Sequence, residues 1–161
     1  MIKLEEKGKK MREIKFRGFS KILNTWTYGD LIQNGSKFYI AKQGFLVSYE
    51  CFGTSINILG FEEFEDIFEV KPESIGQYTG LKDKNGKEIY EGDIVERVIK
   101  CWNDIFKPSD FKEITERGYV KYIQNDCCFM IVNDKYETMH KIEKDFEVIG
   151  NIYEDPDLLK G

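Results

Sequence analysis

Residues 77–95 read QYTGLKDKNGKEIYEGDIV, and two turn signals divide them into short apolar runs. Asn85-Gly86 is typical of a two-residue hairpin turn of type I′, in which both central residues need a positive φ. A second turn is expected at Glu91-Gly92-Asp93, after which Ile94-Val95 opens a strand. We interpret these residues as the first part of a small β-barrel, with everything before them forming a separate layer.

Two further motifs flank this central one. Residues 11–18 read MREIKFRG and residues 148–154 read VIGNIYE. Together with residues 77–95, they resemble the YopX family of phage and prophage proteins, and the three motifs span almost the whole chain from Met11 onward. The resemblance implies a β-rich N-terminal part and an SH3-like barrel at the C-terminal end. It implies no catalytic residues.

Length and composition agree with a mainly β fold. The chain has 161 residues, which suits one domain or two small ones, and 14% of them are aromatic, a class that favours pleated surfaces. We expect a flexible leader at residues 1–10, a β-rich N-terminal domain at residues 11–72 and the SH3-like barrel domain at residues 73–161. The boundary is placed near Lys71-Pro72, because proline restricts its own backbone and that of the preceding residue.

The N-terminal part is predicted to be an antiparallel β meander. Alternation of apolar and polar residues from Ile14 to Phe19 indicates a first strand with one buried face. A second strand is expected from Trp26 to Ile32 with an interruption at Gly29-Asp30, a third around residues 38–40 after the Asn34-Gly35 turn, and a fourth around residues 45–52. Apolar spacing across residues 61–68 fits either a short amphipathic helix or a polar-faced strand.

The C-terminal part is predicted to contain three stretches of strand and two irregular connections. Residues 93–102 form a long strand, residues 119–132 a hairpin around Asn125-Asp126, and residues 146–152 the strand that closes the barrel. Residues 103–118, which are polar and contain Pro108, are expected to form a loop with a helical turn. Residues 136–144 are expected to form a charged connection.

The charge balance argues against general nucleic-acid binding. The formal net charge is −5, whereas phosphate binding requires a basic surface. A local basic segment remains conceivable near the start of the chain, and its best candidates are Arg12, Lys15 and Arg17. The alternative is that these residues belong to a solvated charged leader.

Metal binding and catalysis find little support in the sequence. There are four cysteines and one histidine, His140, with no C-x-x-C pair, and the neighbouring Cys127 and Cys128 would point to opposite faces of one strand. We expect reduced thiols in a cytoplasmic protein, no metal site, no cofactor and no enzymatic activity. A lone histidine is a poor indicator of catalysis without a nucleophile beside it.

One binding surface is predicted around the central hairpin. Its lysines would meet an anionic partner, and neighbouring aromatic side chains would stack on bases or receive a peptide. The alternatives are a hairpin kept soluble by mixed charge and aromatic side chains that pack in the core. The residues of this surface are Lys82, Lys84, Lys87, Tyr78, Tyr90 and Trp102.

These features lead to three hypotheses of function. The first is a non-enzymatic accessory protein of a phage or prophage that forms a homo-oligomer and acts as a binding module for a host or phage protein. The second is an SH3-like barrel that binds nucleic acid, and the third is an oligomer that captures a host factor or a small nucleotide. No segment is long and apolar enough to span a bilayer and no secretory signal is present, so we expect no membrane association and a location in the bacterial cytoplasm.

Overall fold

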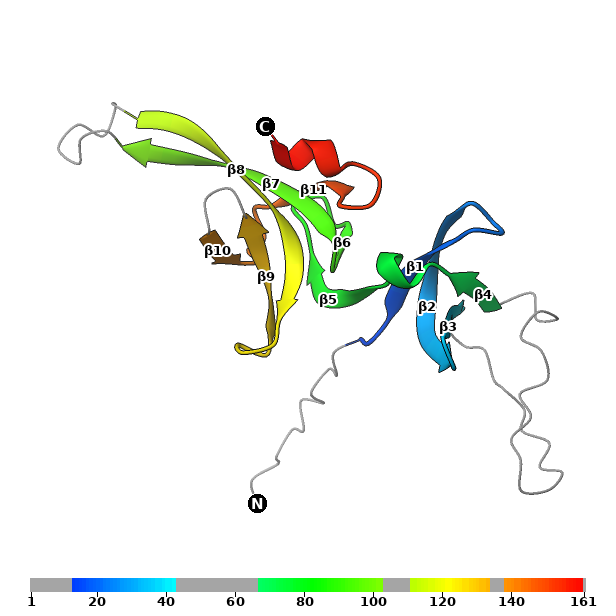
Figure 1. The fold of residues 1–161 in the computed structure, drawn as a ribbon. Coiled ribbons are helices and arrows are strands. Elements are labelled where there is room, and N and C mark those ends of the chain that lie inside the picture. Colours follow the sequence, from blue (N-terminus) through cyan, green and yellow to red (C-terminus); the bar gives the residue numbers. More distant parts are fainter. Residues whose placement is uncertain (1–12, 43–66, 103–110, 134–137, 161) are drawn as a thin grey trace, which may run out of the picture.

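The computed structural model describes residues 13–42, 67–102, 111–133 and 138–160. The mainly β prediction is confirmed, because the described residues form strands with only two short 3-10 turns among them. The predicted leader at residues 1–10 and the predicted strand around residues 45–52 lie outside the described residues. The elements of Figure 1 are β1 (Phe16–Ser20), β2 (Thr25–Asn34), β3 (Lys37–Ala41), β4 (Ile67–Val70), η2 (Pro72–Ser74), β5 (Gly76–Lys82), β6 (Glu88–Tyr90), β7 (Asp93–Trp102), β8 (Phe111–Ile123), β9 (Cys128–Asn133), β10 (Thr138–Lys141), β11 (Glu147–Asn151) and η3 (Pro156–Lys160).

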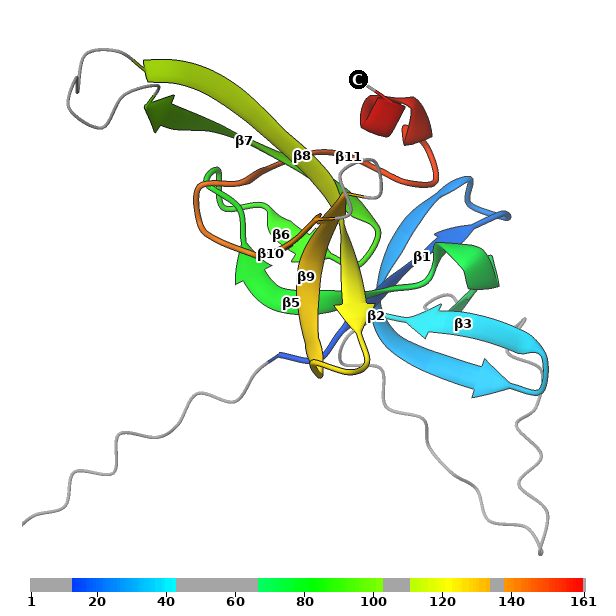
Figure 2. The ribbon, with the colours of Figure 1, turned by 60° about the vertical axis from the view of Figure 1, so that its left-hand side comes forward.

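The first four strands close into a small barrel. Each is antiparallel to the next, and β4 returns to β1 through the pair Ser20 and Val70. Closure depends on a glycine, because a Cβ at Gly18 would lie 2.8 Å from the Val70 side chain. Figure 2 shows β1, β2 and β3 gathered on one side of the molecule, and β5 continues from β1 towards the other side. The small barrel is therefore joined to the second half of the chain by the pairing of β1 with β5, at Phe16 with Gln77 and Arg17 with Gly76.

The second half of the chain forms a five-stranded antiparallel sheet with the order β10-β9-β8-β7-β11. The β5–β6 hairpin packs against this sheet, since Ile89 of β6 shares one buried cluster with Val95, Val120 and Phe146. Backbone bonding fastens the same hairpin, because the Lys84 N–H donates to the Phe146 carbonyl at 2.9 Å. Hairpin and sheet thus enclose one core, in the part of the chain for which the family resemblance implies an SH3-like barrel.

The central turn differs in type from the prediction. Gly86 has a φ of +84°, but Asn85 does not have a positive φ, so the type I′ assignment is wrong. Asp83 and Lys87 instead flank a three-residue loop, in which the Asp83 N–H donates to the Lys87 carbonyl and the Gly86 N–H donates to the Asp83 carbonyl. This is the pattern of a type I turn followed by one left-handed glycine. The second predicted turn is present, and Gly92 there has a φ of +83°.

Three local predictions are corrected by the strand assignments. β2 runs without interruption through Gly29, where a side chain would collide with the Ala41 carbonyl oxygen. Residues 111–118 belong to β8 and not to a loop, and residues 138–141 form β10 inside the predicted charged connection. The start of β8 is rich in charged residues and β10 reads Thr-Met-His-Lys, so neither shows the regular apolar alternation that marks a strand with one buried face.

The connection between the two halves begins at Pro72. This proline starts η2, and the hydroxyl of Ser74, its last residue, donates to the Lys71 carbonyl at 2.7 Å. The domain boundary predicted at residue 72 stays a prediction, since β5 pairs with β1 immediately beyond it. Within the described ranges, no helix has the length and apolar character needed to cross a membrane.

Candidate functional site

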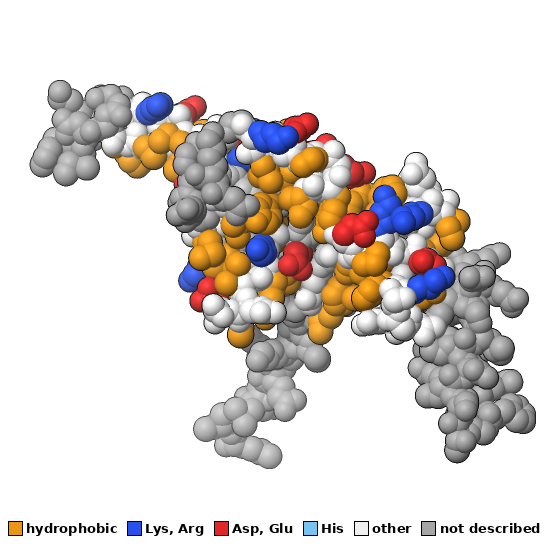
Figure 3. Space-filling model, viewed as in Figure 1, with side chains coloured by type: hydrophobic (Ala, Val, Ile, Leu, Met, Phe, Trp, Pro, Cys, Tyr) orange, Lys and Arg blue, Asp and Glu red, His pale blue; other side chains and the backbone are white. Residues whose placement is uncertain are grey.

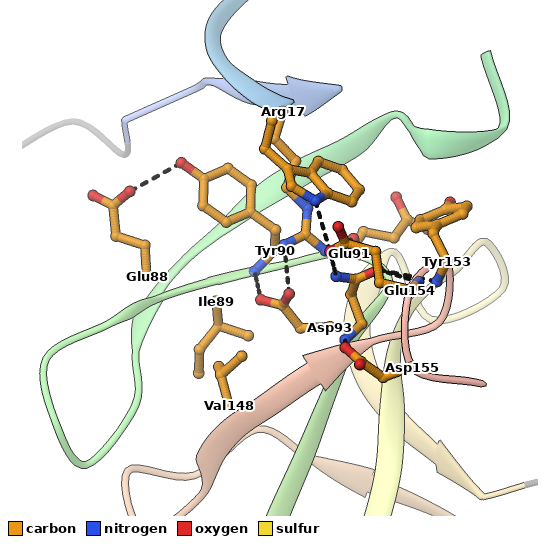
Figure 4. A network of polar contacts seen from close by, with 12 residues as sticks. Arg17, Glu88, Ile89, Tyr90, Glu91, Asp93, Val148, Tyr153, Glu154 and Asp155 are labelled. Carbon is orange, nitrogen blue, oxygen red and sulfur yellow. Dashed lines mark hydrogen bonds and ion pairs between the residues drawn. The ribbon is translucent and has the colours of Figure 1, made fainter. Parts of the chain in front are cut away.

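A buried ion pair lies where the small barrel meets the second sheet. Arg17 of β1 donates from Nη1 to Asp93 Oδ1 at 2.5 Å, and its Nη2 donates to the Glu91 carbonyl at 3.1 Å. The second oxygen of Asp93 accepts the Tyr90 N–H at 2.8 Å. Arg17 is 5% exposed and Asp93 1% exposed. The pair therefore joins two strands that are far apart in sequence, as Figure 4 shows.

Aromatic rings enclose the Arg17 guanidinium. Its central carbon lies 4.7 Å from the Trp26 ring centroid and 5.2 Å from that of Tyr90. Tyr153 packs against Trp26 at 5.9 Å, and Tyr28 packs against Tyr90 at 5.5 Å. Cation–π attraction thus adds to the ion pair in a site from which water is largely excluded.

Polar contacts extend this junction in two directions. On one side Tyr90 donates its hydroxyl to Glu88 at 2.9 Å, and Lys15 donates to the other oxygen of Glu88 at 2.7 Å. On the other side the Trp26 indole N–H donates to Glu154 at 2.8 Å, and Asn151 donates to the same carboxylate oxygen at 2.6 Å. The network therefore runs from the first strand to the C-terminal end of the last one.

The three sequence motifs converge at this junction. Lys15 and Arg17 come from residues 11–18, Tyr90 and Asp93 come from residues 77–95, and Glu154 comes from residues 148–154. None of these motifs could complete the network alone. Their shared role in this structure is to fasten the small barrel to the second sheet.

Burial and hydrogen bonding shift the pKa values of three groups at the junction. Burial raises the pKa of Asp93, and the neighbouring Arg17 and the Tyr90 N–H only partly oppose that effect. Burial also raises the pKa of the Tyr90 phenol, with a further contribution from its hydrogen bond to Glu88, so the phenol stays protonated and acts as a donor. Burial acts in the same direction on Glu88, but the hydrogen bonds from Lys15 and Tyr90 outweigh it and lower the pKa of that carboxyl. The carboxylates of Asp93 and Glu88 thus accept hydrogen bonds within the network, whereas the buried Nε of Arg17 has no hydrogen-bond partner.

A hollow of about 590 Å³ lies in the second sheet, next to the lone histidine. His140 lines it together with Ile114, Glu116, Ile131 and Phe146. Neither Cys127 nor Cys128 reaches this hollow, because both occupy the exposed β8–β9 turn region. Among the described residues, no group of three or more His, Cys, Asp or Glu side chains could hold a metal ion.

The predicted basic and aromatic residues are not gathered on one surface. Tyr78 and Tyr90 are buried, at 5% and 2% exposed, while Trp102 lies at the far end of β7 and is 57% exposed. On the hairpin, Lys84 is bound to Glu147 at 2.6 Å, and Lys82 and Lys87 flank the loop.

The predicted basic segment is also committed to contacts inside the protein. Arg17 forms the buried ion pair with Asp93, and Lys15 binds Glu88 and Glu13. Arg12 lies outside the described residues. The sequence could not show this outcome, because the carboxylates that bind Arg17 and Lys15 at the junction come from residues more than 70 positions further along the chain.

Among the described residues, several large apolar side chains are exposed on a two-stranded ribbon that projects from the second sheet. β11 pairs with β7 only as far as Glu96, and β9 pairs with β8 only from Tyr119 onward. Beyond these points, among the described strands, β7 and β8 pair only with each other, and we call Val98–Trp102 with Phe111–Thr115 the ribbon. Figures 1 and 3 show the ribbon reaching away from the body with hydrophobic side chains on its surface. Its large exposed apolar residues are Val98, Trp102, Phe111 and Ile114, which are 58%, 57%, 41% and 39% exposed.

Sequence reasoning included Trp102 in the predicted surface but missed the rest of the ribbon. The strand predicted at residues 93–102 contained Val98, but residues 98–102 show no regular alternation of apolar and charged residues that would have marked an exposed apolar face. Its partner strand was hidden because residues 111–115 were assigned to a loop. The structure therefore exposes large apolar side chains on the ribbon, whereas Tyr78 and Tyr90 beside the central hairpin are buried.

Comparison with known proteins supports the family resemblance. The family model described as YopX protein matches residues 15–160. Protein EF1440 from Enterococcus faecalis, known from a crystal structure, is 21% identical; the alignment covers 92% of this chain and 99% of that one, with a TM-score of 0.46. A search of curated proteins finds no match. Because the family model spans nearly the whole chain, the protein belongs to the YopX family.

Proposed function

We propose that this protein is a non-enzymatic accessory protein of a phage or prophage that self-assembles, and that the ribbon is its assembly surface. The observation that carries the proposal is the set of large apolar side chains exposed on the ribbon. Contiguous apolar surface on a soluble protein marks an interaction site more often than a free face.

Strand physics supports the same conclusion. An isolated two-stranded hairpin is marginally stable in water, and each strand of the ribbon has an outer edge that no described strand covers. Burial of apolar area contributes roughly 25 cal/mol of favourable free energy per Å². A partner that covers the apolar side chains of the ribbon would therefore stabilise the ribbon as well as the assembly.

The non-enzymatic part of the proposal rests on the junction and the hollow. The ionisable groups of the junction bind one another, and Glu116 in the hollow is held by Arg97 at 2.7 Å. Family membership supports the phage or prophage origin that we propose, and we propose a bacterial cytoplasm as the location with it. The assembly would present its surfaces to a host or phage protein.

Light scattering coupled to size-exclusion chromatography, from micromolar to millimolar protein, tests the assembly. The average mass of the wild type should rise with concentration. Val98→Lys and Trp102→Lys should stay monomeric, whereas the control Ile22→Lys should behave as the wild type, because Ile22 is 82% exposed in a turn far from the ribbon. A wild type that stays monomeric throughout this range would refute the self-assembly.

A further inference from the structure

We propose that the outer face of the ribbon packs on the same face of a second copy, across a two-fold axis parallel to the strands. The inference rests on the proposed function, because it specifies how the self-assembly takes place. The outer face carries one row of alternating residues from each strand: Val98, Lys100 and Trp102 from β7, and Phe111, Glu113 and Thr115 from β8.

The strand register defines three levels on this face. Trp102 lies opposite Phe111, Lys100 opposite Glu113, and Val98 opposite Thr115. Residues two apart on a strand share a face, so the six side chains lie together. Lys100 also lies over the Phe111 ring at 4.6 Å. The face is therefore an aromatic level, a charged level and a smaller apolar level, in that order from the end of the ribbon towards the body.

A two-fold axis parallel to the strands makes this face complementary to itself. The rotation keeps each level at its height and exchanges the positions of β7 and β8. Lys100 then meets Glu113 of the second copy, Trp102 meets Phe111 of the second copy, and Val98 meets Thr115 of the second copy. Every level finds a matching level, and the charged level gains ion pairs in both directions.

The other two-fold axis that stacks the two faces gives a mismatch. An axis perpendicular to the strands, in the plane of the contact, leaves β7 opposite β7 and reverses the order of the levels. Lys100 would then face Lys100 of the second copy, Glu113 would face Glu113, and Trp102 would face Val98. Like charges placed together in a partly dry contact repel each other and disfavour this arrangement. The charge pattern therefore selects the parallel axis.

The size of the face sets the expected strength. Nearer the body this side of β8 is occupied by η3, since Arg117 donates to the Leu158 carbonyl at 2.6 Å. The contact is thus confined to the ribbon, with six side chains from each copy, whereas stable interfaces use roughly 20–30 residues a side. We therefore expect a weak dimer, with a dissociation constant of about a micromolar or higher.

Zero-length cross-linking tests whether the two charges meet between copies. Unlabelled and ¹⁵N-labelled protein are mixed at millimolar concentration and treated with a carbodiimide, which joins Lys and Glu side chains in contact. Linked Lys100 and Glu113 peptides should include pairs that combine one labelled and one unlabelled chain. The control is Lys37 and Glu69, an exposed pair at 2.9 Å within one chain, which should give only pairs of equal label.

Disulfide trapping tests the axis. A mixture of Val98→Cys and Thr115→Cys proteins, oxidised with diamide, should form a disulfide between positions 98 and 115 of different chains. The perpendicular axis places these positions about 13 Å apart, at roughly 3.3 Å per residue along the strand, and would give none. Val98→Cys alone should give no such link through position 98, and mass spectrometry of the linked peptides identifies each product.

The outcomes separate this inference from the proposed function. If the wild type is monomeric at all concentrations, both fail. If it associates but Lys100 and Glu113 are linked only within one chain, or positions 98 and 115 cannot be trapped, the two-fold ribbon contact is overturned while self-assembly stands. Mixed-label links together with the trapped disulfide support the contact as described.

Discussion

Asp83 illustrates how one side chain fixes several backbone segments. It is 6% exposed, and its Oδ1 accepts the N–H groups of Asn85 at 2.8 Å and Lys87 at 2.9 Å. Its Oδ2 accepts the Val148 N–H at 3.0 Å. One carboxylate therefore closes the central hairpin and binds it to β11. These bonds favour the observed three-residue loop over the predicted two-residue turn.

Asp83 should make stability depend on pH. Burial alone would raise the pKa of this carboxyl, but the backbone donors of Val148, Lys87 and Asn85 outweigh burial and lower it. A group whose folded pKa is lowered stabilises the fold above its unfolded pKa of about 4 and loses that contribution as the pH falls through the folded value.

We therefore expect Asp83→Asn to lose about 1–3 kcal/mol of unfolding free energy at pH 7. The difference from the wild type should shrink as the pH falls below about 4. Urea unfolding between pH 3 and pH 7 measures it. Asp126→Asn in the exposed β8–β9 turn is the control and should match the wild type, and a difference for Asp83→Asn that grew on acidification would contradict the assignment.

Gly86 offers a test of backbone strain alone. Its φ is +84°, and a Cβ built there has no atom within 4 Å, so any cost of substitution arises from the backbone and not from a collision. We expect Gly86→Val to lose about 1 kcal/mol or more, and Gly86→Asn to lose clearly less, because asparagine tolerates the left-handed region. Thermal melts of both variants measure this, and equal melting temperatures would show that residue 86 does not hold this conformation in solution.

At the scale of elements, turns were easier to predict than strands. Glycine and asparagine residues correctly predicted the positions of the central hairpin and of the turn at Gly92. Both turns contain a residue with positive φ, which glycine adopts most easily. The type of the central turn was missed, since Asp83 supplies an acceptor that the dipeptide Asn85-Gly86 does not reveal. β8 was cut short because its first residues are exposed on both faces of the ribbon and lack a buried row.

The ribbon should exchange its backbone amide hydrogens faster than the rest of β7. Ile94 and Val95 are fully buried and lie between β8 and β11, whereas Val98–Trp102 pair with β8 alone. Hydrogen exchange at low protein concentration should therefore show strong protection at residues 94–96 and weak protection at residues 98–102.

Raising the concentration should increase protection in the ribbon and leave residues 94–96 unchanged, if the ribbon is the assembly surface. Residues 37–41 of β3 serve as the internal control, since they lie in the small barrel. Equal protection along all of β7 in dilute protein would show that the ribbon is stable without a partner.

At the scale of the whole molecule, the junction is the contact that we expect to couple the unfolding of the two halves. The sequence placed Arg17 and Lys15 in a basic segment, and only the folded chain shows that their carboxylate partners are Asp93 and Glu88. Such pairs join residues distant in sequence, and periodicity and spacing report only near neighbours. The exposed face of the ribbon, which we propose as the assembly surface, was hidden for the same reason, because exposure depends on where neighbouring strands end.

Fluorescence can follow the junction separately from the overall fold. The chain has two tryptophans, so Trp102→Phe leaves Trp26, which packs against Arg17 and Tyr153, as the single reporter. In this background the fluorescence and far-ultraviolet circular dichroism transitions in urea should coincide, as in a two-state protein.

Adding Asp93→Asn should lower the unfolding free energy by about 3–5 kcal/mol, because it leaves a buried guanidinium without its counterion. Adding Arg17→Met as well should recover part of that loss, since the unpaired charge is then gone. If Asp93→Asn left the fluorescence transition in place, the ion pair would not be what couples the halves.

The ion pair between Arg17 and Asp93 spans 76 positions of the sequence, and this has a consequence for the order of folding. During synthesis, Arg17 of β1 leaves the ribosome well before Asp93, whose carboxylate will pair with it. Contacts at such separation form slowly, since the chain must close a long loop before they contribute. The first of the described strands is therefore among the last to reach its final surroundings, and a chaperone that acts on the nascent chain would meet β1 with its arginine still in water.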